Sequence, residues 1–238
     1  MTPSGAVSPK PSDREAGHSP DDKIAVALRG FGPLGILAIL VVLSGNLIAP
    51  PLSAVLVLLW VYRSHTPWRD IGYVRPNSWL KSLAIGSVFG SVFKLVMKAL
   101  VMPLLYPDPV NHAYHYLVGN RAALPGMLFA VIIGAGFGEE TVFRGYFFER
   151  LGMLLGNSVG AKVFIVIFTA GLFAISHYSV QGLAGTEQAM ITGLVFGGIF
   201  AVTGRIWMIM CAHAAFDVTA VAIIYWNLEV KVAHLIFH

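Results

Sequence analysis

Three clusters of ionisable side chains in the second half of the 238-residue sequence could carry out acid–base chemistry. They combine carboxylates with imidazoles. A carboxylate can take a proton from water, an imidazole can orient that water, and a further donor can stabilise a developing oxyanion. These groups are sufficient for hydrolysis. The clusters are Glu139-Glu140-x-x-x-Arg144, Phe173-x-x-x-His177 and His213-x-x-x-Asp217.

Helical spacing predicts different roles for the two neighbouring glutamates. Glu140 and Arg144 are four residues apart, so on an α-helix they share a face and form a good ion pair. Glu139 is turned by about 100° from Glu140 at 3.6 residues per turn, so Arg144 neutralises it less easily. We therefore expect Glu140 and Arg144 to be structural, and Glu139 to be free for acid–base work.

The composition indicates that these clusters lie in a membrane. The chain is 56% hydrophobic and only 12% charged, with a mean hydropathy of +0.73. Soluble domains carry roughly a quarter charged residues, so a water-soluble globule of this size is excluded. The net charge of +4 is explained by Lys and Arg in cytoplasmic loops, and no nucleic-acid partner is expected. The predicted fold class is all-α, a polytopic transmembrane helical bundle.

The hydrophobic segments predict about seven spans, within a range of six to eight. Residues 31–62 are apolar and uncharged, and Pro50-Pro51 divides them into two spans, although one long kinked helix is an alternative. The other spans are expected at 79–105, 124–151, 161–177, 188–203 and 206–226, with loops at 106–123 and 179–187.

The chain is expected to form one domain behind a polar tail. Residues 1–28 are rich in proline and charge and predict a disordered cytoplasmic tail. Residues 29–238 predict a single transmembrane domain, with a motif-bearing core at about 120–226. The excess of Lys and Arg in alternate loops favours a cytoplasmic N-terminus and a multi-pass location in the cell (inner) membrane.

Two geometric expectations follow from these spans. His213 and Asp217 are one turn apart, so Asp217 is expected to accept a hydrogen bond from the imidazole and fix its tautomer. Straight helices with a rise of about 1.5 Å per residue place Glu139 toward the inner side and His177 toward the outer side. Shared chemistry needs both within reach of one water, so different helix ends, a tilt or a break must correct this offset.

The three clusters in this order, each on a predicted membrane helix, resemble the signature of the CAAX proteases and bacteriocin-processing enzymes. This CPBP or Abi family includes the type II CAAX prenyl endopeptidases. The resemblance covers about residues 125–220, and the glycine-rich segment 193–198 and the turn at 203–205 support it. It implies an intramembrane, metal-independent glutamate-type endopeptidase without a cofactor. The implied partners are a membrane-associated peptide or protein substrate and the lipid bilayer.

The resemblance also implies roles, position by position. Glu139 would be the general base, and His177 would help to activate the attacking water. His213 and the residue at position 217 would stabilise the oxyanion, with Glu140 and Arg144 in support. The prenyl endopeptidases carry Asn at the last position, whereas this chain has Asp217, as bacterial relatives also do. An ionised Asp cannot donate to an oxyanion, so Asp217 is either protonated or only orients His213.

Other functions remain open at this point. A metal-dependent membrane hydrolase could hold zinc or another divalent ion with Glu139, Glu140, His177, His213 and Asp217, although the helical HExxH spacing is absent. In a non-catalytic membrane scaffold or bacteriocin-immunity type protein, Glu139 could be changed without effect, whereas substitutions of packing residues would abolish the function. A transporter could use them as a proton relay, but it would be expected to show an inverted repeat.

Four basic residues near the clusters are expected to extend toward the membrane surface. Lys94 and Lys98 lie one turn apart in the predicted span 79–105, and Arg144 and Arg150 lie near a helix end. Long basic side chains at such positions bury their aliphatic stems and keep the charged end in water. No role in catalysis is therefore predicted for Lys94, Lys98 or Arg150.

Overall fold

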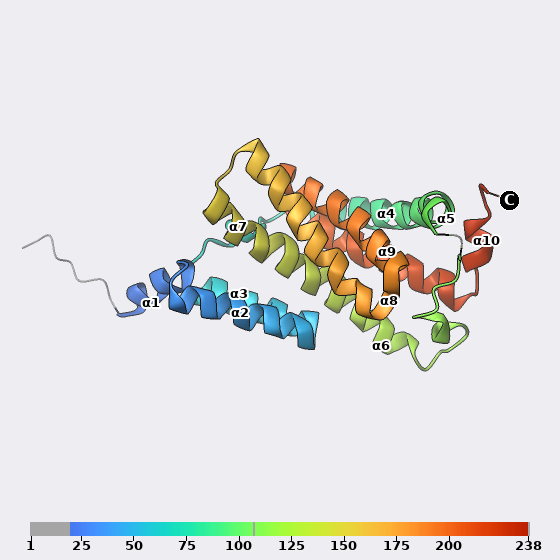
Figure 1. Ribbon diagram of the computed structural model, residues 1–238, viewed down its shortest axis with the longest axis horizontal. Helices are drawn as coiled ribbons and strands as arrows, with labels where there is room; N and C mark the ends of the chain where they lie inside the picture. The colour runs from blue at the N-terminus through green and yellow to red at the C-terminus, as the bar shows by residue number, and fades with distance from the viewer. Residues whose placement is uncertain (1–19, 107, 238) are drawn as a thin grey trace, which may run out of the picture.

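The computed structural model describes residues 20–106 and 108–237, and within these ranges the chain is helical and contains no strand. The predicted all-α fold class is confirmed for this part of the chain. Figure 1 shows an elongated bundle with α1 at one end and α10 at the other. The α-helices are α1 (Pro20–Arg29), α2 (Pro33–Ile48), α3 (Pro50–Arg63), α4 (Trp79–Val96), α5 (Met102–Leu105), α6 (Leu124–Phe129), α7 (Phe147–Leu155), α8 (Val159–Thr203), α9 (Trp207–Tyr225) and α10 (Glu229–Ala233).

Three π-helical segments and two 3₁₀ turns lie between these α-helices in the described residues. The π-helical segments are η3 (Met97–Val101), η5 (Ala130–Glu139) and η6 (Thr141–Tyr146). The 3₁₀ turns are η2 (Trp68–Ile71) and η4 (His115–Leu117). Helices α6, η5, η6 and α7 follow one another without a break and form one stretch of 32 residues. The Glu139–Arg144 cluster lies in the π-helical part of this stretch, and this rare geometry is frequent at functional sites.

Helix α1 lies within the segment predicted to be disordered. Asp21 and Asp22 in its first turn and Arg29 in its last turn suit the helix dipole. The indole nitrogen of Trp60 donates to the Leu28 carbonyl at 3.0 Å and ties α1 to α3. The prediction of disorder is therefore wrong for residues 20–28, because these tertiary contacts stabilise the helix. The rest of the predicted tail lies outside the described residues.

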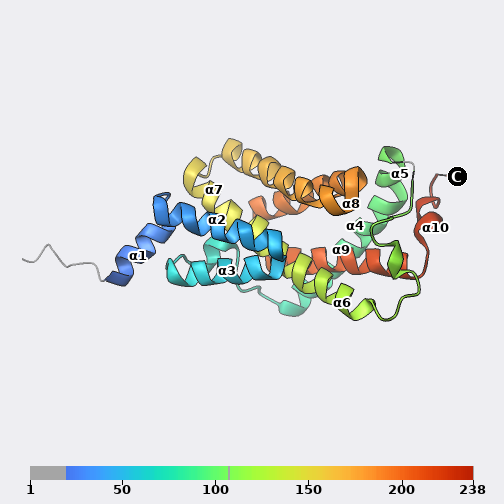
Figure 2. The same cartoon turned by 60° about the horizontal axis from the view of Figure 1, so that its bottom comes forward.

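The long apolar stretch forms two antiparallel helices, and not one kinked helix. Figure 2 shows α2 and α3 side by side, and the Ser53 hydroxyl donates to the Val42 carbonyl at 2.8 Å between them. Ala49 at their junction has an extended backbone with φ −165°. The 16 residues of α2 and 14 of α3 extend about 24 and 21 Å at 1.5 Å per residue. Each is shorter than a hydrocarbon core of about 30 Å.

Helix α8 contains two predicted spans and the segment between them. It runs for 45 residues, and within it only Gly182 has non-helical angles, φ 63° and ψ −159°. This region of backbone space is essentially restricted to glycine. A Cβ on Gly193 would lie 3.0 Å from Ala170, and one on Gly197 would lie 3.4 Å from Val166. The two arms of α8 therefore run antiparallel and correspond to the predicted spans 161–177 and 188–203. The predicted loop 179–187 is helical except for the reversal at Gly182.

The predicted number of about seven spans is not confirmed. Four helical stretches are long and apolar enough to cross a membrane: Trp79–Leu105, Leu124–Leu155, Val159–Thr203 and Trp207–Tyr225. The bent pair formed by α1 and α2, which meet at 64°, brings the count to five at most. The difference arises because α2 and α3 are short, with 16 and 14 residues, and because the two antiparallel arms of α8 are counted here as one stretch.

Helix α9 lies at the centre of the bundle, between α4 and η5. A Cβ on Gly90 of α4 would lie 1.9 Å from the Ala212 carbonyl oxygen of α9. A Cβ on Gly136 of η5 would lie 2.8 Å from the Ala214 side chain, on the other side of α9. Small residues therefore allow the three backbones to approach closely, as in other membrane bundles. His213 lies in the middle of this contact.

Candidate active site

The turn at residues 156–158 places Glu139 and His177 at similar positions along the bundle axis. Helix α7 ends at Leu155, Gly156 has φ 80°, and the Ser158 hydroxyl caps α8 by accepting from the Ala161 amide at 3.1 Å. Glu139 lies roughly as far before this turn as His177 lies after it. The rings of Phe143 and Phe173 meet between the two helices at 5.1 Å. The offset in membrane depth between Glu139 and His177 that the sequence predicted is largely removed. The reason is that the first helix ends at Leu155 and the next begins at Val159, both nearer the turn than predicted.

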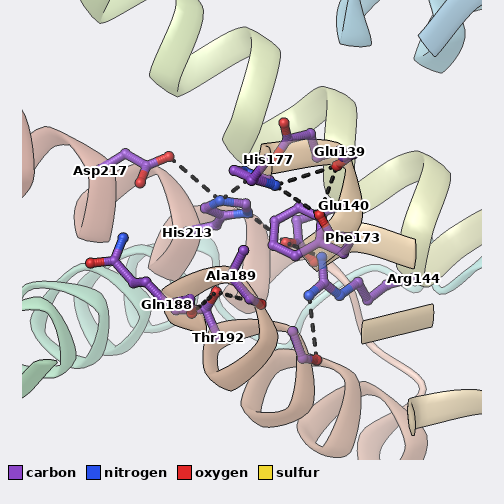
Figure 3. A network of polar contacts seen from close by, with 12 residues as sticks. Glu139, Glu140, Arg144, Phe173, His177, Gln188, Ala189, Thr192, His213 and Asp217 are labelled. Carbon is purple, nitrogen blue, oxygen red and sulfur yellow. Dashed lines mark hydrogen bonds and ion pairs between the residues drawn. The ribbon is translucent and has the colours of Figure 1, made fainter. Parts of the chain in front are cut away.

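All four predicted catalytic residues line one cavity of about 500 Å³: Glu139, His177, His213 and Asp217. They come from three helical stretches that are far apart in sequence, as Figure 3 shows. The tip of the α2–α3 hairpin, Ile48 to Pro51, forms another part of the cavity wall. The structure therefore brings together the residues that the sequence selected.

His213 is held by Glu140, and not by Asp217 as predicted. Its Nδ1 lies 2.6 Å from Glu140 Oε1, and because a carboxylate can only accept, Nδ1–H is the donor. Its Nε2 lies 3.5 Å from Asp217 Oδ2 and 3.8 Å from Glu139 Oε2. The close approach of α9 to η5 turns Nδ1 toward Glu140. The expectation that Asp217 fixes the tautomer is therefore corrected, and Nε2 faces two further carboxylates.

The predicted ion pair between Glu140 and Arg144 is present. Arg144 Nη1 lies 2.9 Å from Glu140 Oε1, and the two side chains are fully buried. The guanidinium carbon also lies 4.8 Å from the centre of the Phe173 ring, over its face. Glu140 thus joins Arg144 to His213 and fixes the position of the imidazole. Arg144 does not extend to the membrane surface, because its charge is neutralised inside the bundle.

Arg150 is also buried, contrary to prediction. Its Nη1 donates to the Arg29 carbonyl at 2.7 Å, and its guanidinium lies 4.5 Å from the Trp60 ring. A bond to Glu149 at 2.6 Å neutralises its charge. Arg150 therefore ties α7 to α1 and α3 near one end of the bundle, away from the cavity.

Glu139 differs from Glu140 in lining the cavity, although each of the two carboxylates has an Oε2 without a hydrogen-bond partner among the described residues. Both of these oxygens are buried. His177 Nδ1 lies 2.8 Å from the Phe173 carbonyl oxygen in its own helix. A carbonyl only accepts, so Nδ1 carries the proton of a neutral ring, and Nε2 is left as an acceptor. The site therefore offers two proton acceptors, a carboxylate and an imidazole nitrogen, on one cavity.

Sequence reasoning missed several polar residues of this cavity, among them Lys94, Tyr114 and Gln188. Tyr114 lies in the segment between α5 and α6 and is close in space to Asp217 and Glu139. Burial raises the pKa of the Tyr114 hydroxyl, and the charges of Asp217 and Glu139 raise it further. The neutral phenol is a hydrogen-bond donor beside the carboxylates. No pattern in the sequence marked it, because only tertiary folding brings this segment to the cavity.

Lys94 and Lys98 do not extend to the membrane surface as expected. The Lys94 side chain is 7% exposed, and its Nζ donates to Gln188 Oε1 at 2.9 Å. Lys98 Nζ lies 3.2 Å from Glu229 Oε1, and Glu229 is buried. The prediction failed because it considered only the stem of each lysine, and not the polar partners on α8 and α10.

Metal binding was the main chemical alternative for these residues. Within residues 20–106 and 108–237, no group of three or more His, Cys, Asp or Glu side chains has the arrangement of a metal site. Glu140 Oε1 contacts both Arg144 Nη1 and His213 Nδ1, and Glu140 does not line the cavity.

The fold and the site define a helical protein with segments long and apolar enough to cross a membrane and a cavity lined by carboxylates and imidazoles. Residues 121–219 match the model of the Rce1-like family, described as type II CAAX prenyl endopeptidase Rce1-like. This segment contains all six predicted site residues, and the resemblance seen in the sequence is confirmed. The family is a protease family, so the match supports peptidase activity. Searches of curated proteins and of solved structures gave no match.

Proposed function

We propose that the protein is an intramembrane endopeptidase that hydrolyses a peptide bond of a membrane-associated substrate, with Glu139 as the general base. The match to a protease family supports the reaction class. The observation that carries the proposal is the free, buried Oε2 of Glu139 on a cavity that His177 and His213 also line. A carboxylate held away from other donors retains the lone pair needed to take a proton from water.

In the proposed first step, a water molecule binds between Glu139 and the Nε2 of His177. Glu139 takes one proton while the water oxygen attacks the carbonyl carbon of the peptide bond. The carbonyl oxygen becomes an oxyanion, which needs a hydrogen-bond donor positioned in advance. When its ring is doubly protonated, His213 can donate from Nε2 to the oxyanion, because its Nδ1–H already donates to Glu140. The Tyr114 hydroxyl is a second donor on the same cavity.

In the second step the tetrahedral intermediate collapses and the C–N bond breaks. The proton held by Glu139 passes to the leaving nitrogen, which departs as an amine, and Glu139 is again a carboxylate. Glu140 and Arg144 do not touch the substrate in this scheme, and they keep His213 in place. Asp217, 3.5 Å from Nε2, orients the ring and balances its charge.

We also propose a cytoplasmic N-terminus and a location in the cell (inner) membrane. Figure 1 places α1 and α7 at one end of the bundle and α10 at the other. The end with α1 carries Arg29, Arg63 and Arg150, and an excess of Lys and Arg is typical of cytoplasmic loops. The chain outside the first 28 residues acts as one membrane domain in this proposal.

The test is cleavage of a library of apolar peptides in liposomes that contain the purified protein. The arms are wild type, Glu139→Gln and wild type with a chelator. We expect Glu139→Gln to abolish cleavage while its thermal unfolding stays close to wild type. Glu187→Gln is the matched control, because Glu187 also has a buried Oε2 without a partner among the described residues but does not line the cavity.

Each other outcome selects a different function. Cleavage that a chelator stops and added metal restores would replace the proposal with a metal-dependent hydrolase. Cleavage that persists in Glu139→Gln would remove Glu139 from the mechanism. A folded wild type that cleaves no peptide, in cells where Glu139→Gln has no effect, would favour the scaffold or immunity role.

A further inference from the structure

A buried carboxylate on α10 is not used by the proposed mechanism. Glu229 is the first residue of this helix and is 2% exposed. It lies just beyond the stretch Trp207–Tyr225, which is long and apolar enough to cross a membrane. A buried carboxylate loses the water that stabilises its charge, so other polar groups must replace that water. The groups that do so here lie far from Glu229 in the sequence.

The carboxylate of Glu229 and its lysine partner hold the segment between α5 and α6. Glu229 Oε1 accepts from the backbone amide of Asn111 at 2.9 Å and from Lys98 Nζ at 3.2 Å. Its Oε2 lies 3.7 Å from His115 Nδ1. Lys98 in turn donates to the Pro109 carbonyl. The ion pair therefore contacts the segment at Pro109, Asn111 and His115.

Tyr114 lies between two of these contacts and reaches the catalytic cavity. Its side chain lines that cavity together with Glu139 and His213. Gln181 Nε2 donates to the Tyr114 hydroxyl oxygen at 3.4 Å. Because the oxygen accepts in this bond, the O–H proton is still available to donate to a substrate oxygen. The position of this donor depends on the segment that carries it.

The segment that carries Tyr114 contains no α-helix in its described part, residues 108–123, and only the short turn η4 is regular. Ordering irregular chain costs about 1–2 kcal/mol per residue in backbone entropy, so contacts must fix it. The Gly119 amide donates to the Tyr225 carbonyl at 3.0 Å on one side of Tyr114. Glu229 fixes the other side. Figure 1 and Figure 2 both place the segment at the end of the bundle that carries α10.

We propose that Glu229 is a positioning residue, whose carboxylate holds residues 109–115 so that the Tyr114 hydroxyl stays on the catalytic cavity. The inference rests on the proposed endopeptidase function, in which Tyr114 donates to the oxyanion. Tyr114 is then a catalytic residue, and Glu229 acts only through it. Both lie outside residues 121–219, so the family match assigns neither of them a role.

The experiment compares two double variants that differ in how well the side chain at position 229 accepts a hydrogen bond. They are Lys98→Met/Glu229→Gln and Lys98→Met/Glu229→Met. Each removes the ion pair as a whole, so neither partner is left as an unpaired buried charge. Both lose the bond from Lys98 to Pro109 equally. Glutamine keeps an oxygen for the Asn111 amide, whereas methionine offers only a weakly accepting sulfur.

Cleavage of one reporter peptide in liposomes gives kcat and KM for each double variant, alone and combined with Tyr114→Phe. Thermal unfolding and the hydrogen exchange of the amides of residues 109–115 are measured on the same full-length proteins. The matched control is Lys231→Gln, because Lys231 is an exposed charge on the same helix. This control should behave as wild type in every measurement.

We expect Tyr114→Phe to lower kcat about 100-fold with little change in KM, as for the loss of one oxyanion donor. With Tyr114 present, Lys98→Met/Glu229→Met should have a kcat about 10- to 100-fold below that of Lys98→Met/Glu229→Gln, because a misplacement of about 1 Å costs a factor of that order. With Tyr114→Phe, the two double variants should have the same kcat. Exchange of the Asn111 amide should be faster in the Glu229→Met variant in both backgrounds.

Two results would overturn the inference. One is an equal kcat for the two double variants when Tyr114 is present. The other is the same ratio between them with and without Tyr114, which a purely structural carboxylate would cause.

The proposed function fails separately from this inference. Cleavage by wild type with an equal kcat in the two double variants would retain the peptidase and reject Glu229 as a positioning residue. If wild type cleaves no peptide, the peptidase is rejected together with the catalytic role of Tyr114. Faster exchange in the Glu229→Met variant would then retain Glu229 only as the group that holds the segment.

Discussion

Gly90 gives the sharpest test of how helix packing positions the site. A Cβ at this position would lie 1.9 Å from the Ala212 carbonyl oxygen and 2.8 Å from its carbon, both of which are backbone atoms. Helices α4 and α9 must therefore separate by about 1 Å before a methyl group fits, since real contacts of this kind stay above 3.0 Å. Gly90→Ala should lower the free energy of unfolding by about 1–3 kcal/mol, the usual cost of overpacking.

The same displacement reaches the chemistry, because His213 follows Ala212 in α9. The bond from His213 Nδ1 to Glu140 is only 2.6 Å long, and a shift of about 1 Å would break or distort it. A misplacement of that size costs on the order of 100-fold in rate. Gly90→Ala should therefore lower the rate of peptide cleavage by about that factor at temperatures where the protein is still folded.

The assay combines thermal unfolding in detergent with cleavage of one reporter peptide in liposomes. Gly198→Ala on α8 is the matched control, since a Cβ at Gly198 would meet nothing within 4 Å. The control should be neutral or slightly stabilising, because alanine favours a helix over glycine by up to about 1 kcal/mol. If Gly90→Ala melts and cleaves as wild type does, the close α4–α9 contact does not position His213.

Three further predictions concern other contacts. Glu140→Gln should lower the free energy of unfolding by about 3–5 kcal/mol because it leaves Arg144 buried without its carboxylate; the double variant Glu140→Gln/Arg144→Gln should lose less in thermal unfolding, and additive losses would contradict this. Ser53→Ala should cost only about 0.6–1 kcal/mol, measured in the same way, because one bond between α2 and α3 is lost; a larger loss would mean that more than this bond stabilises the hairpin. Hydrogen bonds from the amide of Val110 and from the His112 ring hold the pKa of Asp108 below its usual value. The Asp108 carboxylate therefore stabilises its loop fully at pH values above the unfolded pKa of about 3.9. This stabilisation is lost as the pH falls through the lower pKa of the folded state. Hydrogen exchange of the Val110 amide, corrected for its intrinsic rate, should therefore speed up at low pH, and Asp108→Asn should remove that dependence.

Local spacing was enough to predict part of the site. The four-residue step from Glu140 to Arg144 is a property of any helix, and it produced the buried pair at 2.9 Å. The difference between the two glutamates also followed from their adjacency on a helix. The all-α fold followed from composition alone, since a chain with so little charge cannot cover a soluble surface.

Contacts between helices could not be predicted in the same way. The partner of His213 was expected one turn away at Asp217, but α9 packs against η5 so closely that Glu140 reaches Nδ1 first. Lys94 was assigned to the membrane surface because the sequence does not show that α8 folds back and presents Gln188. The reversal of α8 depends on one glycine, Gly182, which has a positive φ of 63°. No pattern in the surrounding sequence predicts that conformation.

The turn at residues 156–158 separates two helical stretches, one from Glu139 to the turn and one from the turn to His177, and these must be of similar length. Gly156 ends one helix and Ser158 begins the next, so residues added between them would loop out without changing either helix. One residue added inside either helix would shift its motif along the axis by about 1.5 Å and rotate it by about 100°. Glu139 and His177 would then no longer share a level. The chain can therefore accept a reporter or a tag at Asn157, while its two flanking helices can change length only together.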